Sequence, residues 1–202
     1  MQNTQIPEHP ELHEPWSEEM AEWYTEKYGE HACNHTTVEL ADVKPDDFLL
    51  DIGCGSGTAV REAASVLVTG QAIGVDFSPA MVAIATEKTK QHAQAQRIRF
   101  LLGEAGALPV SDGSQTVVTA INSFHHWRDP KAGLAEVVRV LAKNGRLVIC
   151  EEIFGEERGP NHTMDARSLS DLLEKSGFSV TMSGVRRADD VDVTVAVARK
   201  TT

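Results

Sequence analysis

The stretch Leu49-Leu50-Asp51-Ile52-Gly53-Cys54-Gly55-Ser56-Gly57 decides the fold of this 202-residue chain. It predicts a short buried strand that runs into a glycine-rich turn, and residues 58–64 predict a helix after the turn. Glycines let the backbone adopt positive φ and approach a ligand without a Cβ in the way. The helix that follows presents its first amides and the positive end of its dipole to the same turn. The stretch therefore predicts a strand–loop–helix unit with a ligand site at the loop.

Two details of this loop restrict the kind of ligand that it could bind. The glycines are spaced G-x-G-x-G, whereas dinucleotide-binding proteins carry G-x-G-x-x-G. Asp51 stands at the end of the strand, where an acid is a poor neighbour for a pyrophosphate and a good one for a cation. On these residues the chain resembles the class I S-adenosylmethionine-dependent methyltransferases, whose first motif reads much like residues 50–57.

Composition restricts the setting and the partners. Hydrophobic residues make up 41% and charged residues 24% of the chain, which is typical of one globular domain. No apolar run approaches the ~20 residues of a membrane span, and residues 1–8 lack the features of a secretory signal. Three scattered cysteines favour neither a disulfide framework nor a zinc site. We therefore expect a cytoplasmic protein with no membrane partner.

The charge balance points to a small substrate. The formal net charge is −11, and an acidic surface repels phosphate backbones, so no nucleic-acid partner is expected. A small-molecule methyl acceptor is the expected partner. The oligomeric state stays open.

Residues 1–44 are predicted to form an N-terminal helical cap segment, and residues 45–202 the S-adenosylmethionine-binding methyltransferase domain. Ser17 predicts a helix cap, followed by a helix rich in aromatic residues. These aromatics either pin the helix to the domain or roof the cofactor and substrate pocket; both interpretations stay open for Trp16, Trp23, Tyr24 and Tyr28. A helix from about residue 34 to 42 would separate His31, Cys33 and His35, so no metal site is expected.

Beyond the glycine loop the pattern alternates strands and helices. The helix after the loop is expected to end near residues 69–70. Strands are predicted at residues 72–76, 97–102, 115–121 and 146–152, and helices begin at the caps Ser78 and Asp129. A polar loop at residues 156–167 precedes a helix at 168–175. The last two strands, 178–185 and 191–199, are joined so tightly that they must be antiparallel.

The resemblance covers about residues 49–199, and the His-His-Trp and Asp-Pro segments within residues 125–147 follow the pattern of small-molecule methyltransferases. It implies an α/β fold: a Rossmann-like, doubly wound, seven-stranded sheet of order 3-2-1-4-5-7-6, with strand 7 antiparallel and helices on both faces. It implies S-adenosyl-L-methionine as cofactor and S-adenosyl-L-homocysteine as product. Glu104 replaces the aspartate usual in the family. The residues carried over as cofactor-binding are Asp51, Gly53, Cys54, Gly55, Gly57, Asp76, Phe77, Met81, Glu104, Ala105 and Asn122.

The expected reaction is methyl transfer by in-line displacement, which depends mainly on alignment of the reacting atoms. A base is needed only if the nucleophile must lose a proton, and His125 and His126 are then the candidates, with Glu151 and Glu152 as alternatives. In this family such a His-His-Trp segment often forms the pocket wall and is not catalytic, so that interpretation stays open too. Two other functions stay open: a non-catalytic S-adenosylmethionine-binding protein, and an oxidoreductase with a nucleotide cofactor, against which Asp51 and the glycine spacing argue. The acceptor and its acceptor atom stay undetermined.

Overall fold

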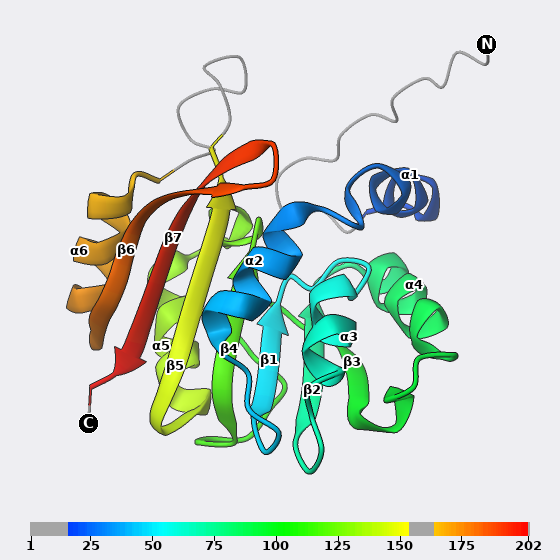
Figure 1. The fold of residues 1–202 in the computed structure, drawn as a ribbon, viewed down its shortest axis with the longest axis horizontal. Helices are drawn as coiled ribbons and strands as arrows, with labels where there is room; N and C mark the ends of the chain where they lie inside the picture. Colours follow the sequence, from blue (N-terminus) through cyan, green and yellow to red (C-terminus); the bar gives the residue numbers. More distant parts are fainter. Residues whose placement is uncertain (1–15, 154–163, 202) are drawn as a thin grey trace.

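A seven-stranded sheet with the order β3-β2-β1-β4-β5-β7-β6 lies at the centre of the computed structural model, which describes residues 16–153 and 164–201 (Figure 1). This is the predicted order. The strands are β1 (Phe48–Ile52), β2 (Gln71–Asp76), β3 (Ile98–Leu102), β4 (Gln115–Ile121), β5 (Leu141–Glu152), β6 (Phe178–Ala188) and β7 (Val191–Lys200). The first five are parallel, and β7 is antiparallel to both β5 and β6. The short connection between β6 and β7 required the second of these pairings.

Successive side chains of β1 point to opposite faces of the sheet and belong to two separate core clusters. Leu49 packs in the cluster that contains residues of α2 (Ala32–Ala41) and α3 (Thr58–Ala64). Leu50, its neighbour, points to the opposite cluster, with residues of α5 (Pro130–Val140) and α6 (Ala166–Lys175). Helices therefore cover both faces, because successive side chains of a strand point to opposite sides of the sheet.

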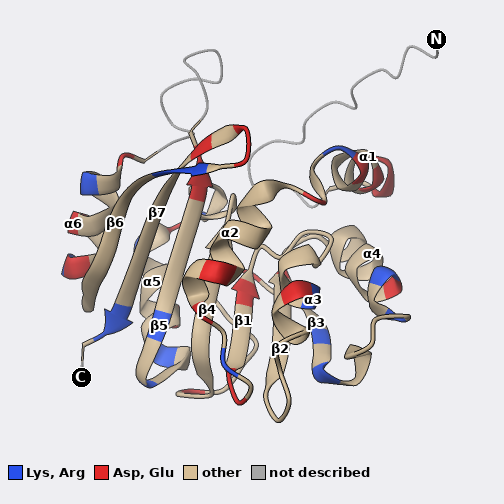
Figure 2. Cartoon of the chain, in the orientation of Figure 1, with Lys and Arg blue, Asp and Glu red and all other residues tan. Residues whose placement is uncertain are grey.

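Two further helices complete the side of the sheet near β3. Helix α4 (Pro79–Thr89) packs on β2 and β3, and α1 (Glu18–Tyr28) packs against α4. The caps Ser17, Ser78 and Asp129 all accept the backbone N–H bonds expected of them. Short 3₁₀ turns lie at Ala95–Arg97 and Phe124–His126. Figure 2 shows acidic residues on α1, which begins with Glu18 and Glu19.

Several predicted boundaries were wrong. Helix α3 ends at Ala64, well before residue 69, because the carbonyl of Pro45 accepts the N–H groups of residues 68–70 and holds them in a turn. Helix α2 begins at Ala32, with His31 as its cap. Strand β5 begins at Leu141 and includes a bulge at Asn144, where φ is 65°.

The polar loop predicted at residues 156–167 extends too far toward the C-terminus. Asp165 caps α6, and the helix already includes Arg167. The rest of that loop, up to residue 163, lies outside the described residues. Among residues 16–153 and 164–201, none of the helices has the length and apolar character that a membrane crossing requires.

Candidate cofactor and acceptor site

A cavity of about 830 Å³ lies at the carboxyl ends of the parallel strands. Its lining includes the last residues of β1, β2 and β4, the glycine loop, and side chains of α1. Strand β1 lies between β2 and β4. The chain adds β2 and β3 on one side of β1 and then crosses over to add β4 and β5 on the other side. Ligands of doubly wound sheets bind at this kind of switch point.

The three positions of the loop require glycine for different physical reasons. All have positive φ, at 72°, 51° and 79° for Gly53, Gly55 and Gly57. A Cβ on Gly53 would lie 2.5 Å from the Cβ of Ser123, and one on Gly57 would lie 2.5 Å from the ring of Phe100. A Cβ on Gly55 would meet no atom within 4 Å. Gly55 therefore faces open space where it lines the cavity, whereas Gly53 and Gly57 permit close packing.

Asp51 is buried at the end of β1 and lines the cavity. Its Oδ1 accepts the hydroxyl of Thr119, on the neighbouring strand β4, at 2.7 Å. Burial raises the pKa of Asp51 to about 7; the Thr119 bond opposes that rise and the charge of Asp76 adds to it. A cation in the cavity would favour the ionised form of this carboxyl group.

Asp76 ends β2 and connects it to the glycine loop. Its Oδ2 accepts the N–H of Gly55 and its Oδ1 the N–H of Ser78, both at 2.9 Å. Burial raises the pKa of Asp76, and these backbone bonds oppose that rise. The carboxylate is thereby held at the cavity wall, beside the loop.

Ten of the eleven residues predicted to bind the cofactor line the cavity, and all eleven are described. Gly57 does not line it; this glycine stands at the N-terminus of α3 and packs on Phe100. Phe77 is partly exposed, and Glu104 is exposed. Met81 is buried, and the hydroxyl of Thr25, on α1, donates to its sulfur at 3.9 Å.

The aromatic residues of the N-terminal segment line the same cavity and also contact one another. The rings of Trp16 and Tyr24 meet edge to face with centroids 4.7 Å apart, and those of Tyr24 and Tyr28 are 4.9 Å apart. The ammonium of Lys27 lies 5.0 Å from the ring centroid of Trp23. Burial raises the pKa of Tyr24 to about 12. The two interpretations of this helix are thus compatible, because its aromatics form a wall of the cavity.

The segment after β4 lies on the other side of the cavity, where His125 and His126 both line it with ring centroids 3.9 Å apart. Glu151, near the end of β5, is buried, and its Oε1 accepts the N–H groups of Ser123 and Phe124 at 3.0 and 2.8 Å. Its Oε2 contacts Nδ1 of His125. His126 is exposed. The structure thus gives the two neighbouring histidines different surroundings, because Glu151 contacts His125 whereas the side chain of His126 is exposed.

Asn122 is the residue that turns the chain out of β4. Its φ is 47°, a conformation that asparagine tolerates better than most residues. Its side-chain oxygen accepts the N–H of Glu152 at 2.7 Å, which ties the ends of β4 and β5 together at the cavity wall.

Sequence reasoning missed two features of this wall. His31 caps α2 through Nδ1, and its Nε2 lies 3.1 Å from Oε2 of Glu152, which closes the cavity between α2 and β5. The indole N–H of the buried Trp127 has no hydrogen-bond partner in the part of the chain that the structure describes. Its six-membered ring packs on Gly133, where a Cβ would lie 2.3 Å from the ring. The position of His31 just before a helix could have indicated the cap. No local sequence pattern indicates the His31–Glu152 pair or the packing of Trp127 on Gly133.

The histidines and cysteine near α2 do not converge. His35 pairs with Glu62 on the surface, whereas Cys33 is buried. No group of three metal-ligating side chains occurs within residues 16–153 and 164–201.

The fold and this cavity define an α/β protein whose glycine loop and two strand-ending acids lie at the edge of the sheet where doubly wound proteins bind their ligands. Residues 50–149 match the family model described as "Methyltransferase domain". The chain belongs to the class I S-adenosylmethionine-dependent methyltransferases, as the resemblance of its first motif indicated.

Known proteins agree with this assignment. A demethylmenaquinone methyltransferase of Thermus thermophilus is 37% identical over 114 residues, which cover 56% of this chain and 51% of that protein. The 27-O-demethylrifamycin SV methyltransferase of Amycolatopsis mediterranei is 33% identical over 147 residues, 68% of this chain and 53% of that protein. The match therefore spans about half the length of these curated relatives.

The fold as a whole has close structural counterparts. The crystal structure of a SAM-dependent methyltransferase from Aquifex aeolicus superposes with a TM-score of 0.77 and covers 92% of this chain and 99% of its own, at 18% sequence identity. The predicted seven-stranded Rossmann-like fold is confirmed.

Proposed function

We propose that this protein transfers the methyl group of S-adenosylmethionine to a small-molecule acceptor. The observation that carries the proposal is the pair of buried carboxyl groups, Asp51 and Asp76, on either side of a glycine loop that opens into the cavity. A sulfonium cofactor is cationic, so buried acids suit it, whereas a pyrophosphate would be repelled. The names of the two curated relatives describe small-molecule acceptors, which supports the same class here.

Different residues of the cavity would bind different parts of the cofactor. Asp76 would bind the ribose hydroxyls, and Asp51 with the glycine loop would hold the methionine part. Asn122 would lie at its amino acid end. Phe77, Met81, Glu104 and Ala105 would surround the adenine. We assign Gly57 a supporting role, because it packs on Phe100 and does not line the cavity.

Bound S-adenosylmethionine supplies an electrophilic methyl carbon on a positively charged sulfur. The chain's own contribution is to align the acceptor with that carbon, to exclude water, and to remove a proton where the acceptor carries one. The aromatic wall formed by α1 would cover the acceptor. His125 is our candidate for the base, because Glu151 holds its ring at the cavity wall.

Gly55 and Gly113 provide a matched test of the cofactor site. Both have positive φ, and a Cβ on either would meet no atom within 4 Å, but Gly113 lies outside the cavity lining. Asparagine tolerates positive φ, so Gly55→Asn and Gly113→Asn should perturb folding similarly. We expect Gly55→Asn to weaken S-adenosylmethionine binding by at least tenfold in calorimetric titration, because its side chain enters the cavity, and Gly113→Asn to leave binding unchanged.

Equal affinities for the two variants would contradict this placement of the cofactor. Failure of the unaltered protein to bind either S-adenosylmethionine or S-adenosylhomocysteine would overturn the proposed function, and binding of NADH in their place would favour an oxidoreductase. Tight cofactor binding without turnover of any acceptor in a broad panel would favour a non-catalytic binding protein.

A further inference from the structure

Two buried cysteines meet between α2 and β5, at the wall of the cavity. Cys33 lies in the first turn of α2, Cys150 lies in β5, and the helix packs directly on this strand. Both side chains are fully buried in the same core cluster, and a hydrogen bond joins their thiol groups. The methyl transfer proposed above uses neither thiol. The fold has therefore brought two oxidisable groups into contact for which the proposed reaction gives no reason.

The surroundings of the pair favour the thiolate form of Cys150. The hydroxyl of Thr37, one turn along α2 from Cys33, donates to the carbonyl of Cys33 at 2.7 Å and also contacts the Cys150 thiol. The bond from Cys33 lowers the pKa of Cys150, whereas the same bond, together with burial, raises the pKa of Cys33. Cys150 is therefore the sulfur that loses its proton first, and Cys33 remains a thiol beside it.

The cavity gives access to this pair. Cys33 lines the cavity, as do His31 and Glu152, whereas Cys150 lies behind Cys33 and does not line it. The ring of His31 bonds the Cys33 thiol through its side chain and accepts the backbone N–H of Cys33, and its Nε2 pairs with Glu152. A small molecule in the cavity is thus the reagent that can meet the two sulfurs.

We propose that Cys33 and Cys150 form a redox modification site, at which a small hydroperoxide converts the two thiols reversibly to a disulfide. The site lies outside the proposed methyl transfer and does not depend on it. The new bond would join the first turn of α2 covalently to β5, next to His31 and Glu152. Oxidation would therefore hold α2 against the sheet at the cavity wall, and reduction would release it.

The step balances with hydrogen peroxide as the oxidant. The Cys150 thiolate attacks one peroxide oxygen and the O–O bond breaks, which leaves Cys150 as a sulfenic acid and releases hydroxide. The sulfur of Cys33 then attacks the sulfur of Cys150, the S–S bond forms, and a second hydroxide leaves. The two protons of the original thiols convert both hydroxides to water. A thiol reductant reverses the change by exchange with the disulfide.

Intact mass spectrometry of the folded protein, after brief treatment with hydrogen peroxide, tests the site. We expect a loss of about 2 Da, for two hydrogens, that dithiothreitol reverses. Peptide mapping without reduction should show Cys33 joined to Cys150. The absence of this loss in the folded protein would overturn the proposal, and so would a disulfide between Cys54 and either of the other two cysteines.

Cys54→Ala is the matched control, because Cys54 is also a buried cysteine that lines the cavity. This variant should still lose about 2 Da, whereas Cys33→Ala and Cys150→Ala should not. Circular dichroism before the treatment establishes which variants are folded. If a variant does not fold, the peptide map of the unaltered protein decides the pairing by itself.

S-adenosylhomocysteine tests the route through the cavity. At a concentration that calorimetric titration shows to be saturating, it should slow disulfide formation at least about fivefold, because it fills the cavity that Cys33 lines. An unchanged rate with the ligand bound would contradict this route. The mass measurement needs no ligand, so a failure of the redox site is distinct from a failure of the proposed methyltransferase function.

Hydrogen exchange tests the effect of the disulfide on the cavity wall. Amides of α2 should exchange at least about fivefold more slowly in the oxidised protein than in the reduced protein, because the bond restrains the first turn of the helix. Amides of α6, which packs on the opposite face of the sheet, should change less. Unchanged exchange in α2 would show that oxidation does not hold this helix against β5.

Discussion

Asp51 shows how one residue of the proposed cofactor site responds to its surroundings. The side chain is 2% exposed, and its hydrogen bond from the Thr119 hydroxyl offsets only part of the cost of burying a charge. The carboxyl group consequently titrates at about pH 7 in the ligand-free protein, with burial as the main cause and Asp76 as a further one. An aspartate that is half neutral near pH 7 couples ligand binding to protonation.

We expect S-adenosylmethionine to bind more tightly at pH 8 than at pH 6, by up to about tenfold. The cationic ligand favours the ionised form and lowers the pKa of Asp51 in the complex, so affinity is lost as pH falls through the ligand-free value of about 7. Calorimetric titration at the two pH values measures this difference, and it should shrink in Asp51→Asn. An unchanged difference in that variant would assign the coupling to another group, with Asp76 the nearest candidate.

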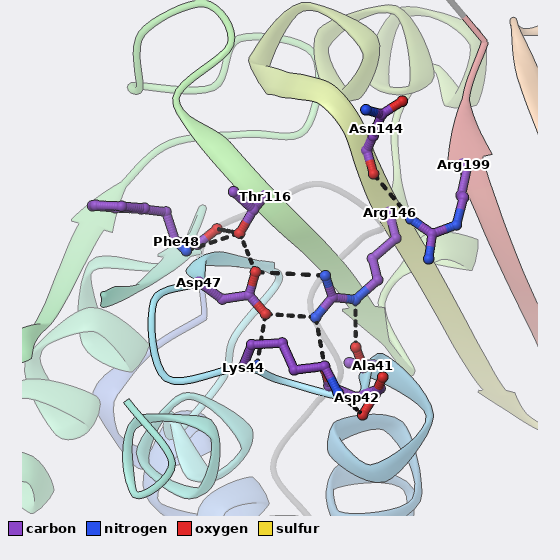
Figure 3. Close-up of polar contacts among 9 residues, drawn as sticks. All are labelled: Ala41, Asp42, Lys44, Asp47, Phe48, Thr116, Asn144, Arg146 and Arg199. Atoms are coloured by element: carbon purple, nitrogen blue, oxygen red, sulfur yellow. Dashed lines mark hydrogen bonds and ion pairs between the residues drawn. The ribbon is translucent and has the colours of Figure 1, made fainter. Parts of the chain in front are cut away.

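At the scale of elements, α2 is held at both ends. His31 caps its first turn beside the cavity, and Arg146 of β5 bonds the last carbonyls, those of Ala41 and Asp42 (Figure 3). The same guanidinium pairs with Asp47 at 2.6 Å, just before β1. This cluster satisfies helix-end carbonyls that would otherwise lack partners, and it joins α2 to two strands of the sheet. Helix α2, whose first turn is capped by His31 at the cavity, is thus bonded at its other end to β5.

Arg146→Leu should lower the free energy of unfolding by about 3 kcal/mol, because it leaves the buried Asp47 without its cation and the α2 carbonyls without donors. The side chains of Arg146 and Asp47 are 14% and 8% exposed. Although burial opposes it, the pKa of Asp47 is held below its usual value by Arg146 and Thr116. Urea denaturation measures the loss.

Arg187 and Asp192 provide the control for this prediction, because their ion pair joins the exposed ends of β6 and β7, with side chains 59% and 55% exposed. Arg187→Leu should cost less than about 1 kcal/mol. Losses of equal size in the two variants would show that the clamp around Arg146 has no special role.

At the scale of the whole molecule, the topology brings distant segments to one edge of the sheet. The order of the strands places the acids of β1 and β2, the histidines after β4 and Glu152 of β5 around a single cavity, and α1 adds its aromatic wall. All three tryptophans of the chain, Trp16, Trp23 and Trp127, line this cavity. Intrinsic fluorescence should therefore report binding directly.

Saturation with S-adenosylhomocysteine should shift tryptophan emission to shorter wavelength, because the ligand and the closely packed α1 exclude water from the partly exposed rings of Trp16 and Trp23. Trp23→Phe should reduce the shift, whereas Trp127→Phe should retain most of it, since Trp127 is already buried. A full shift in a protein lacking both Trp16 and Trp23 would show that α1 does not face the bound ligand.

The sequence by itself predicted the features that depend on neighbouring residues. The caps Ser17, Ser78 and Asp129 accept backbone N–H groups that lie three positions further along the chain. Apolar runs indicate strands whatever the neighbours of each strand in the sheet are. The resemblance then supplied the strand order. Element ends such as that of α3 were wrong because a distant carbonyl, that of Pro45, ended the helix.

Only the tertiary structure decided which side chains meet across the fold. His125 and Glu151 are 26 positions apart, and Arg146 and Asp47 are 99 apart. No periodicity links such residues, because their contact depends on which strands are neighbours and on the register of each pair. The sequence thus determined the glycine loop and the class of protein, whereas strand order and packing decided which histidine Glu151 holds and how α1 and α2 line the cavity.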